Sequence, residues 1–107
     1  MFKQLLSGLF SAGDGLSISD VTQALKEKNT VLLDVREIDE FTSGHIPQAI
    51  NQPLSQLEQF KGDKNKHYLV ICQSGMRSQR ATDYLTSQGY QVVNVKCGMN
   101  AWTGEII

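Results

Sequence analysis

The sequence is poor in cysteine, in long apolar runs and in net charge, and each shortage excludes a class of protein. Two cysteines among 107 residues make a poor disulfide framework, which favours a reducing compartment and predicts a cytoplasmic location. No stretch approaches the roughly 20 consecutive apolar residues that span a bilayer, so we expect no membrane partner. The formal net charge of −1 gives no overall attraction to nucleic acid. The spacings C-x-x-C and H-x-x-x-H are absent, so we expect no metal, and no cofactor is predicted.

What is present fits one globular domain. Hydrophobic residues make up 40% of the sequence and charged residues 20%, an ordinary balance for a folded chain. A length of 107 residues is enough for one domain and too short for two ordinary ones. We interpret residues 1–14 as an N-terminal lead-in segment, because Ser7 and Gly8 interrupt its apolar residues, and residues 15–107 as the domain.

Short apolar runs alternate with amphipathic segments along the domain. Three of the runs are continuous rather than alternating, which is typical of strands covered on both faces, and two weaker runs also predict strands. The five predicted strands are 16–18, 31–33, 49–50, 68–71 and 92–95. Strands that alternate with helices require right-handed crossovers, so the sequence predicts the α/β class with a parallel sheet.

Helix start and stop signals occur between the predicted strands. Ser19 is a candidate N-cap for a first helix, and a longer helix is predicted to begin at Ser78. Glycine at 44 and at 89 predicts the end of a short helix and of the long one. Residues 55–58 read Ser-Gln-Leu-Glu, which fits a capping box.

One loop carries the residues expected for chemistry. The strand 68–71 is followed by Cys72-Gln73-Ser74-Gly75-Met76-Arg77 and then by the helix predicted to begin at Ser78. A thiol between a strand end and a helix N-terminus lies where backbone N–H groups favour an anion, and these groups lower a thiol pKa. Gly75 lets the loop turn its N–H groups inward, and Arg77 adds a cation with planar donor geometry. We therefore predict that Cys72 is a catalytic nucleophile and that the residues from Gln73 to Ser78 bind its substrate.

Two other interpretations of this loop were weighed. Cys72 could be a small core residue, but a core cysteine does not need a glycine and an arginine in the same tight turn. Cysteine phosphatases have five residues between the cysteine and the arginine, whereas four separate Cys72 from Arg77. The shorter loop encloses a smaller anion site, which fits one sulfur atom better than a phosphoryl group.

The sequence resembles the rhodanese family in four motifs that occur in the family's order, from about Leu16 to Trp102. The matching residues are Asp34-Val35-Arg36, then Glu40 with Gly44-His45-Ile46-Pro47 and Ala49, then Cys72 with Gly75 and Arg77, and finally Gly98 with Ala101 and Trp102. Any one of these motifs is weak evidence, but four in order are strong evidence.

The resemblance implies a rhodanese domain over residues 15–107, with a five-stranded parallel sheet flanked by helices on both faces. It also implies a sulfurtransferase in which Cys72 takes a sulfur atom from a donor such as thiosulfate or a persulfide. A thiophilic acceptor such as a thiol then removes that sulfur, and a sulfur-relay protein is a candidate partner. The alternative is a persulfide carrier or binding module that serves a dedicated protein partner.

Four residues around the loop have more than one interpretation. Many catalytic members have a basic residue where this chain has Gln73 or Ser74, so the binding of a dianion such as thiosulfate is expected to be modest. Cys97 stands where the family usually has glycine, and it is either a second thiol for the chemistry or a small buried residue. Arg36 either assists anion binding or forms a salt bridge with Asp34 or Glu40, which is favoured. For His45 a structural role is favoured over that of a base.

Overall fold

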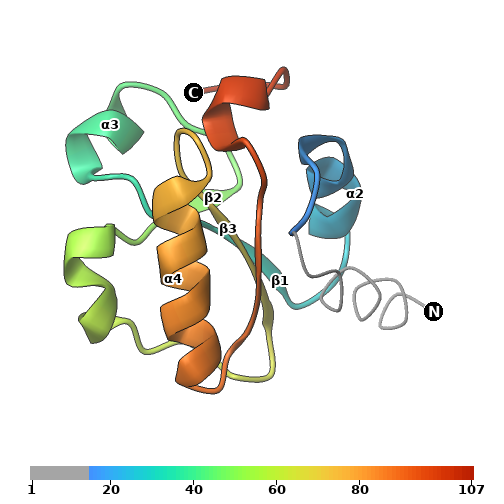
Figure 1. Ribbon diagram of the computed structural model, residues 1–107. Coiled ribbons are helices and arrows are strands. Elements are labelled where there is room, and N and C mark those ends of the chain that lie inside the picture. Colours follow the sequence, from blue (N-terminus) through green and yellow to red (C-terminus); the bar gives the residue numbers. More distant parts are fainter. Residues whose placement is uncertain (1–14) are drawn as a thin grey trace.

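The computed structural model describes residues 15–107, so the lead-in predicted at 1–14 lies outside the described residues (Figure 1). The centre of the described domain is a four-stranded parallel sheet with the strand order β2-β1-β3-β4. The strands are β1 (Thr30–Asp34), β2 (Ala49–Asn51), β3 (His67–Ile71) and β4 (Gln91–Asn94). The register places Asp34 beside Asn51 on one side and Ile71 on the other, so the carboxyl ends of these strands lie at one edge.

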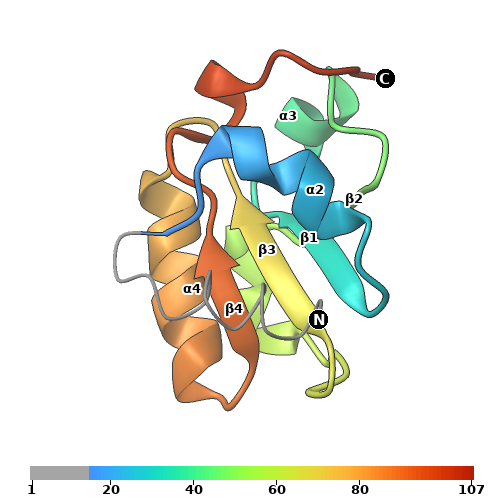
Figure 2. The same cartoon turned by 90° about the vertical axis from the view of Figure 1, so that its right-hand side faces the viewer.

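Both faces of the sheet are covered, which explains why its strands have continuous apolar sequences. Leu32 and Leu69 pack on one face with Val21 and Ala24 of α2 (Val21–Leu25). The neighbouring residues in each strand point to the other face, where Ala81 and Leu85 of α4 (Met76–Ser87) pack. Figure 2 shows the sheet from the side of α2, with α4 behind it. The predicted α/β fold with a parallel sheet and helices on both faces is therefore confirmed.

The sheet differs from the expectation of five strands. Leu16 forms a single parallel bridge with Val95, and its N–H donates to the Asn94 carbonyl at 2.7 Å. Gly15 has a φ of +94°, and a 3₁₀ turn, η1 (Ile18–Asp20), begins two residues after Leu16. Only Leu16 and Ser17 lie between Gly15 and this turn, so the predicted strand 16–18 is reduced to one bridge.

Three helix starts differ from the predictions, each for a local reason. Ser17 precedes η1 and donates its hydroxyl to Asp20 Oδ2 at 2.8 Å, so Ser19 lies inside the turn and is not the cap. The predicted capping box at 55–58 does not form, because these residues lie within a 3₁₀ segment, η2 (Leu54–Gln59), that follows Pro53. The hydroxyl of Ser55 instead donates to Glu37 Oε1 at 2.6 Å. The helix α4 begins at Met76, two residues before the predicted Ser78.

Two short elements complete the carboxyl edge of the sheet. They are α3 (Ile38–Thr42), which ends before Gly44 as predicted, and η3 (Gly98–Ala101). Trp102, after η3, packs against the cluster on the α2 face. Among residues 15–107, no helix has the length and apolar character needed to cross a membrane.

Candidate active site

Strand β3 places Cys72 at the carboxyl edge of the sheet. The strand is buried from Tyr68 to Ile71, and Cys72 continues it as a fully buried residue. The chain then turns through the exposed Ser74 and Met76 before α4 carries it back over the sheet. The sulfur therefore lies directly beneath a loop that is itself exposed to solvent.

Three donors from this loop converge on Cys72 Sγ. The backbone N–H groups of Gly75 and Ser78 donate to the sulfur, at N–S distances of 3.1 and 3.3 Å. The Cys72 thiol donates to the Ser78 hydroxyl oxygen at 3.3 Å, and this hydroxyl donates to the sulfur instead when the sulfur is a thiolate. This arrangement is the inward-facing set of N–H groups predicted from the sequence, and it stabilises an anion.

These donors outweigh the cost of burying the sulfur. Burial raises the pKa of Cys72 and is the largest single influence on it. The Ser78 hydroxyl and the N–H groups of Ser78, Gly75 and Ser74 lower the pKa of Cys72, and together they bring it below its ordinary value of 9.0. The thiolate is therefore the form that the loop favours, and the thiolate is the nucleophilic form of cysteine.

Gly75 explains why α4 begins earlier than predicted. Its φ of +100° lies in the left-handed region, which turns the chain sharply enough for Met76 to start the helix. Ser78 then occupies the first turn of α4, and its N–H and hydroxyl both face the sulfur instead of capping the helix. The residue predicted to begin the helix thus contributes two donors to the anion site.

A second loop, 97–101, holds the cysteine loop in place. The N–H of Met99 donates to the Cys72 carbonyl at 2.9 Å, and the N–H of Asn100 donates to the Gln73 carbonyl at 3.0 Å. The side-chain amide of Gln73 also donates to Asn100 Oδ1, at 2.7 Å. A Cβ atom on Gly98 would lie 2.1 Å from the Cys72 carbonyl oxygen, so only glycine permits this approach.

Cys97 opens this second loop in a left-handed conformation, with a φ of 64°. This φ explains why a glycine would suit the position, since a side chain there is strained. Cys97 is exposed, so the interpretation of Cys97 as a small buried residue is wrong. Both cysteines are free thiols. Its backbone contacts the cysteine loop, because a Cβ on Gly75 would lie 3.1 Å from the Cys97 nitrogen. Its participation in chemistry stays a prediction.

Arg77 does not present a free guanidinium, contrary to the expectation. Its Nη1 and Nη2 donate to Oε1 and Oε2 of Glu40, at 2.7 and 2.9 Å. This bond with Arg77 is the main reason that the pKa of Glu40 falls from 4.5 to about 2. Glu40 also accepts the N–H of Glu37 at 3.0 Å, so α3 is tied to the cysteine loop by a bidentate ion pair.

Arg36 has a structural role. Its guanidinium forms a buried salt bridge with Asp34, at 2.7 Å, and donates to the Gly44 carbonyl at 2.9 Å. The favoured pairing with Asp34 is confirmed, and no donor of Arg36 is directed at Cys72 in the described part of the chain. His45 Nδ1 donates to the Phe41 carbonyl at 2.8 Å, and its ring stacks on Phe41, so the structural role of His45 is also confirmed.

The geometry and the four motifs agree with a comparison to known families. Residues 17–105 match the family described as the rhodanese-like domain. The chain belongs to the rhodanese-like domain family. A Bacillus subtilis protein named "Putative sulfurtransferase YtwF" is 45% identical over 91 residues, covering 78% of this chain and 88% of that protein. "Thiosulfate sulfurtransferase GlpE" of Pseudomonas savastanoi pv. phaseolicola is 39% identical over 83 residues, covering 75% of this chain and 78% of that protein.

The fold of this rhodanese-like chain is also found among solved structures. The crystal structure of a rhodanese-related protein from Thermoplasma volcanium superposes with a TM-score of 0.80 at 31% identity. The match covers 87% of this chain and 96% of that one.

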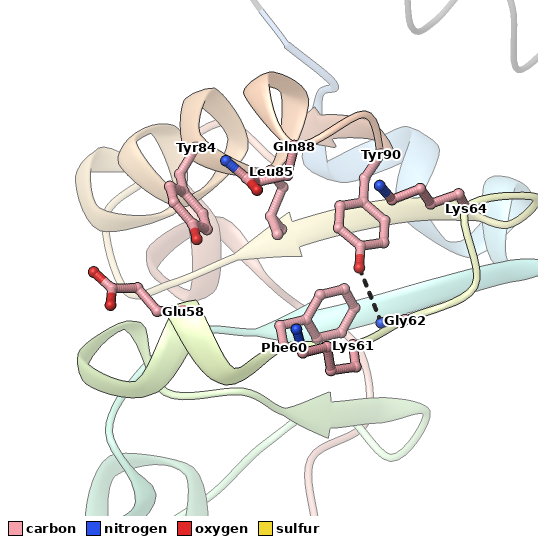
Figure 3. Close-up of a pocket in the computed structure, with 9 residues that line it drawn as sticks. All are labelled: Glu58, Phe60, Lys61, Gly62, Lys64, Tyr84, Leu85, Gln88 and Tyr90. Carbon is pink, nitrogen blue, oxygen red and sulfur yellow. Dashed lines mark hydrogen bonds between the residues drawn. The ribbon is translucent and has the colours of Figure 1, made fainter.

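A separate cavity of about 300 Å³ lies at the other end of α4 of the rhodanese-like domain. The rings of Phe60, Tyr84 and Tyr90 line it, with Lys61 and Lys64 at its margin (Figure 3). Tyr84 is seven residues, or about 10 Å, along α4 from Arg77. The cavity is therefore not part of the cysteine site. Its walls are packing groups, since Phe60 and Tyr90 meet edge to face at 5.2 Å.

Sequence reasoning missed the residues that support the loop from other elements. Glu40 was considered as a partner of Arg36, whereas it binds Arg77, 37 residues away. The signal was present, because Glu40 lies in one rhodanese motif and Arg77 in another. Asn94 was missed altogether, and its side chain donates to the Gly75 carbonyl at 3.3 Å.

Proposed function

We propose that this rhodanese-like protein is a sulfurtransferase that carries sulfane sulfur as a persulfide on Cys72. The observation that carries the proposal is the convergence of the Gly75 and Ser78 N–H groups and the Ser78 hydroxyl on one buried sulfur. These donors stabilise the thiolate before reaction and the negative charge of the persulfide after it. The relatives named as sulfurtransferases support the same chemistry.

The reaction proceeds by two displacements at sulfur. The Cys72 thiolate attacks the outer sulfur of a donor, a bond forms between Sγ and that sulfur, and the sulfur–sulfur bond of the donor breaks. The leaving group, sulfite from thiosulfate or a thiolate from a persulfide, departs with the electron pair. A thiol acceptor then attacks the outer sulfur of the Cys72 persulfide, and the Cys72 thiolate is regenerated as the leaving group.

The loop length supports transfer of sulfur and not of phosphate. The backbone nitrogens of Gly75 and Ser78 already lie within 3.3 Å of Cys72 Sγ, so the short loop closes around this one sulfur atom. The only cation in the loop is paired with Glu40, whereas a phosphoryl group needs free positive charge. We expect no hydrolysis of aryl phosphates.

Intact-mass measurement after exposure to thiosulfate and, separately, to cysteine persulfide tests the proposal. A gain of one sulfur atom is expected on the wild type and on Cys97→Ser, and none on Cys72→Ser. The Cys97→Ser protein is the matched control, because it makes the same change at the other free thiol. Equal labelling of Cys72→Ser, or no label on the wild type from either donor, contradicts the proposal.

A second measurement separates an enzyme from a carrier. Multiple turnovers with a small thiol acceptor are expected for an enzyme. One equivalent of sulfur that loads and then stays on Cys72 would indicate the carrier alternative.

A further inference from the structure

The charge of the cysteine loop depends on one ion pair. Arg77 is the only basic residue between Cys72 and Ser78. Both of its terminal nitrogens bind the Glu40 carboxylate, so the pair has no net charge. The loop therefore offers a donor molecule neutral N–H groups and no uncompensated positive charge.

The other charges near this pair are also unfavourable to an anion. Glu37 directly precedes α3 and adds a second carboxylate on this side of the loop. The hydrogen bond with Glu40 is the main cause that raises the pKa of Arg77, and the negative charges of Glu40, Cys72 and Glu37 raise it further. Arg36 does not compensate, because it is buried against Asp34. Two carboxylates, those of Glu40 and Glu37, therefore act on the Arg77 guanidinium.

Sulfane sulfur donors differ in the charge that they bring to this site. Thiosulfate is a dianion, so its approach to the Cys72 thiolate brings three negative charges together. A thiol persulfide has no sulfonate group and brings at most one negative charge on its sulfur atoms. Cys72 is fully buried, and close approach of like charges is most costly where water is excluded.

We propose that Glu40, by neutralising Arg77, makes this protein selective for thiol persulfides over thiosulfate as sulfur donors. Glu40 is a specificity-determining residue in this proposal, and the inference rests on the proposed transfer of sulfur through Cys72. Both donors give the same Cys72 persulfide, with a thiolate leaving in one case and sulfite in the other. Selectivity therefore arises from the charge of the donor and not from the product on the enzyme.

The variant Glu40→Gln tests the proposal, because it removes the charge while retaining an oxygen that can accept from Arg77 or from the Glu37 N–H. The quantity measured is kcat/KM for loading of Cys72 by thiosulfate divided by kcat/KM for loading by cysteine persulfide. Glu40→Gln is expected to raise this ratio about tenfold, because the released Arg77 guanidinium can form one charge-assisted hydrogen bond with thiosulfate.

Two further variants show whether the released guanidinium is the cause. In Glu40→Gln/Arg77→Gln the ratio is expected to return to within about twofold of the wild type, since no free cation remains. Asp39→Asn is the matched control, because it removes a carboxylate from the same helix at an exposed position that makes no bond to Arg77. It is expected to leave the ratio unchanged.

Ser74→Lys extends the test in case Glu40→Gln fails to fold. Ser74 is exposed in the loop, so a lysine there adds a cation without disturbing the ion pair, and the ratio is expected to rise. An unchanged ratio in the folded Glu40→Gln protein, or in Ser74→Lys where only that variant folds, overturns the proposal. So does a wild-type protein that is loaded by thiosulfate as efficiently as by cysteine persulfide. Failure of both donors to load Cys72 is a different result, and it contradicts the proposed function itself.

Discussion

The two ends of α4 are built from different kinds of interaction. At its N-terminal end, hydrogen bonds and an ion pair fix the loop that carries Cys72, through Gly75, Ser78 and Arg77. At its C-terminal end, aromatic rings meet edge to face beside the separate cavity, with Phe60 and Tyr90 at 5.2 Å. Polar contacts position atoms for chemistry, whereas apolar packing at the other end contributes stability.

The backbone shows the same difference. Gly75, Cys97 and Gly98 all have positive φ near the sulfur, and one of them is not a glycine. At the other end of the sheet, Gly89 has positive φ after the C-terminus of α4, where such a residue is ordinary, and Asn29 has a φ of 67° beside the start of β3. Three residues with positive φ therefore lie in the two loops beside the thiol, and such conformations are common at functional sites. Four variants test this comparison.

The largest combined effect, on stability and on sulfur loading together, is expected from Gly98→Ala. Its new Cβ would lie 2.1 Å from the Cys72 carbonyl oxygen, so the cysteine loop must move. We expect a loss of about 3 kcal/mol in the free energy of unfolding, together with loss of sulfur loading on Cys72. Urea unfolding and intact mass measure the two effects.

The control for Gly98→Ala is Gly89→Ala at the other end of α4. It has the same kind of backbone strain, at a φ of +94°, but its new Cβ meets only the flexible Lys64 side chain at 3.5 Å. It is expected to lose about 1 kcal/mol and to retain sulfur loading. Equal loss of loading in both variants would show that the cysteine loop responds to general destabilisation.

Leu85→Ala is expected to destabilise the fold without changing the thiol. Leu85 is fully buried in the cluster beneath α4, so truncation should cost about 2–5 kcal/mol of the free energy of unfolding. Because Leu85 makes no bond to the cysteine loop, the pH midpoint of Cys72 alkylation in the folded protein should stay the same. A shifted midpoint would mean that the two ends of α4 are coupled.

Ser78→Ala should change the thiol with a smaller effect on stability. The Ser78 hydroxyl is the first of the groups that lower the pKa of Cys72, so its loss should raise that pKa toward 9.0. The pH dependence of Cys72 alkylation, measured in a Cys97→Ser background, gives the midpoint. Ser87→Ala, at the other end of α4, is the matched control. A midpoint unchanged by Ser78→Ala would leave the backbone N–H groups as the sole source of activation.

The smallest effect is expected from Glu40→Gln on stability, because partly exposed ion pairs contribute less than about 1 kcal/mol. The pKa of Glu40 is about 2 in the folded protein and about 4.5 without its partners, so folding favours the ionised form. The contribution is therefore fully present above pH 4.5 and is lost as the pH falls toward 2. Urea unfolding of both proteins across this range should show the difference shrinking with acidity. A difference that is constant with pH would exclude an ionic origin.

The class of the fold and the candidate nucleophile could both be predicted from the amino-acid sequence. Continuous apolar runs such as 68–71 predict strands covered on both faces, because each residue's preference for burial is a local property. Cys72, Gly75 and Ser78 are close in the sequence, so their meeting around one sulfur follows from a single turn. The predicted start of α4 at Ser78 was misplaced by two residues, because the left-handed φ of Gly75 lets the helix begin at Met76.

Only the tertiary structure decided how that nucleophile is supported and what charge surrounds it. Glu40 reaches Arg77 across 37 residues, and Met99 reaches Cys72 from the neighbouring loop after β4. Neither pairing is encoded in local spacing, because each depends on the order of strands that brings separate loops to one edge of the sheet. The pair between Arg36 and Asp34, by contrast, joins residues only two positions apart in the sequence, whereas the exposure of Cys97 is a property of the folded chain. The motif from Cys72 to Arg77 identifies the thiol, but the ion pair between Arg77 and Glu40 determines whether the loop carries an uncompensated positive charge.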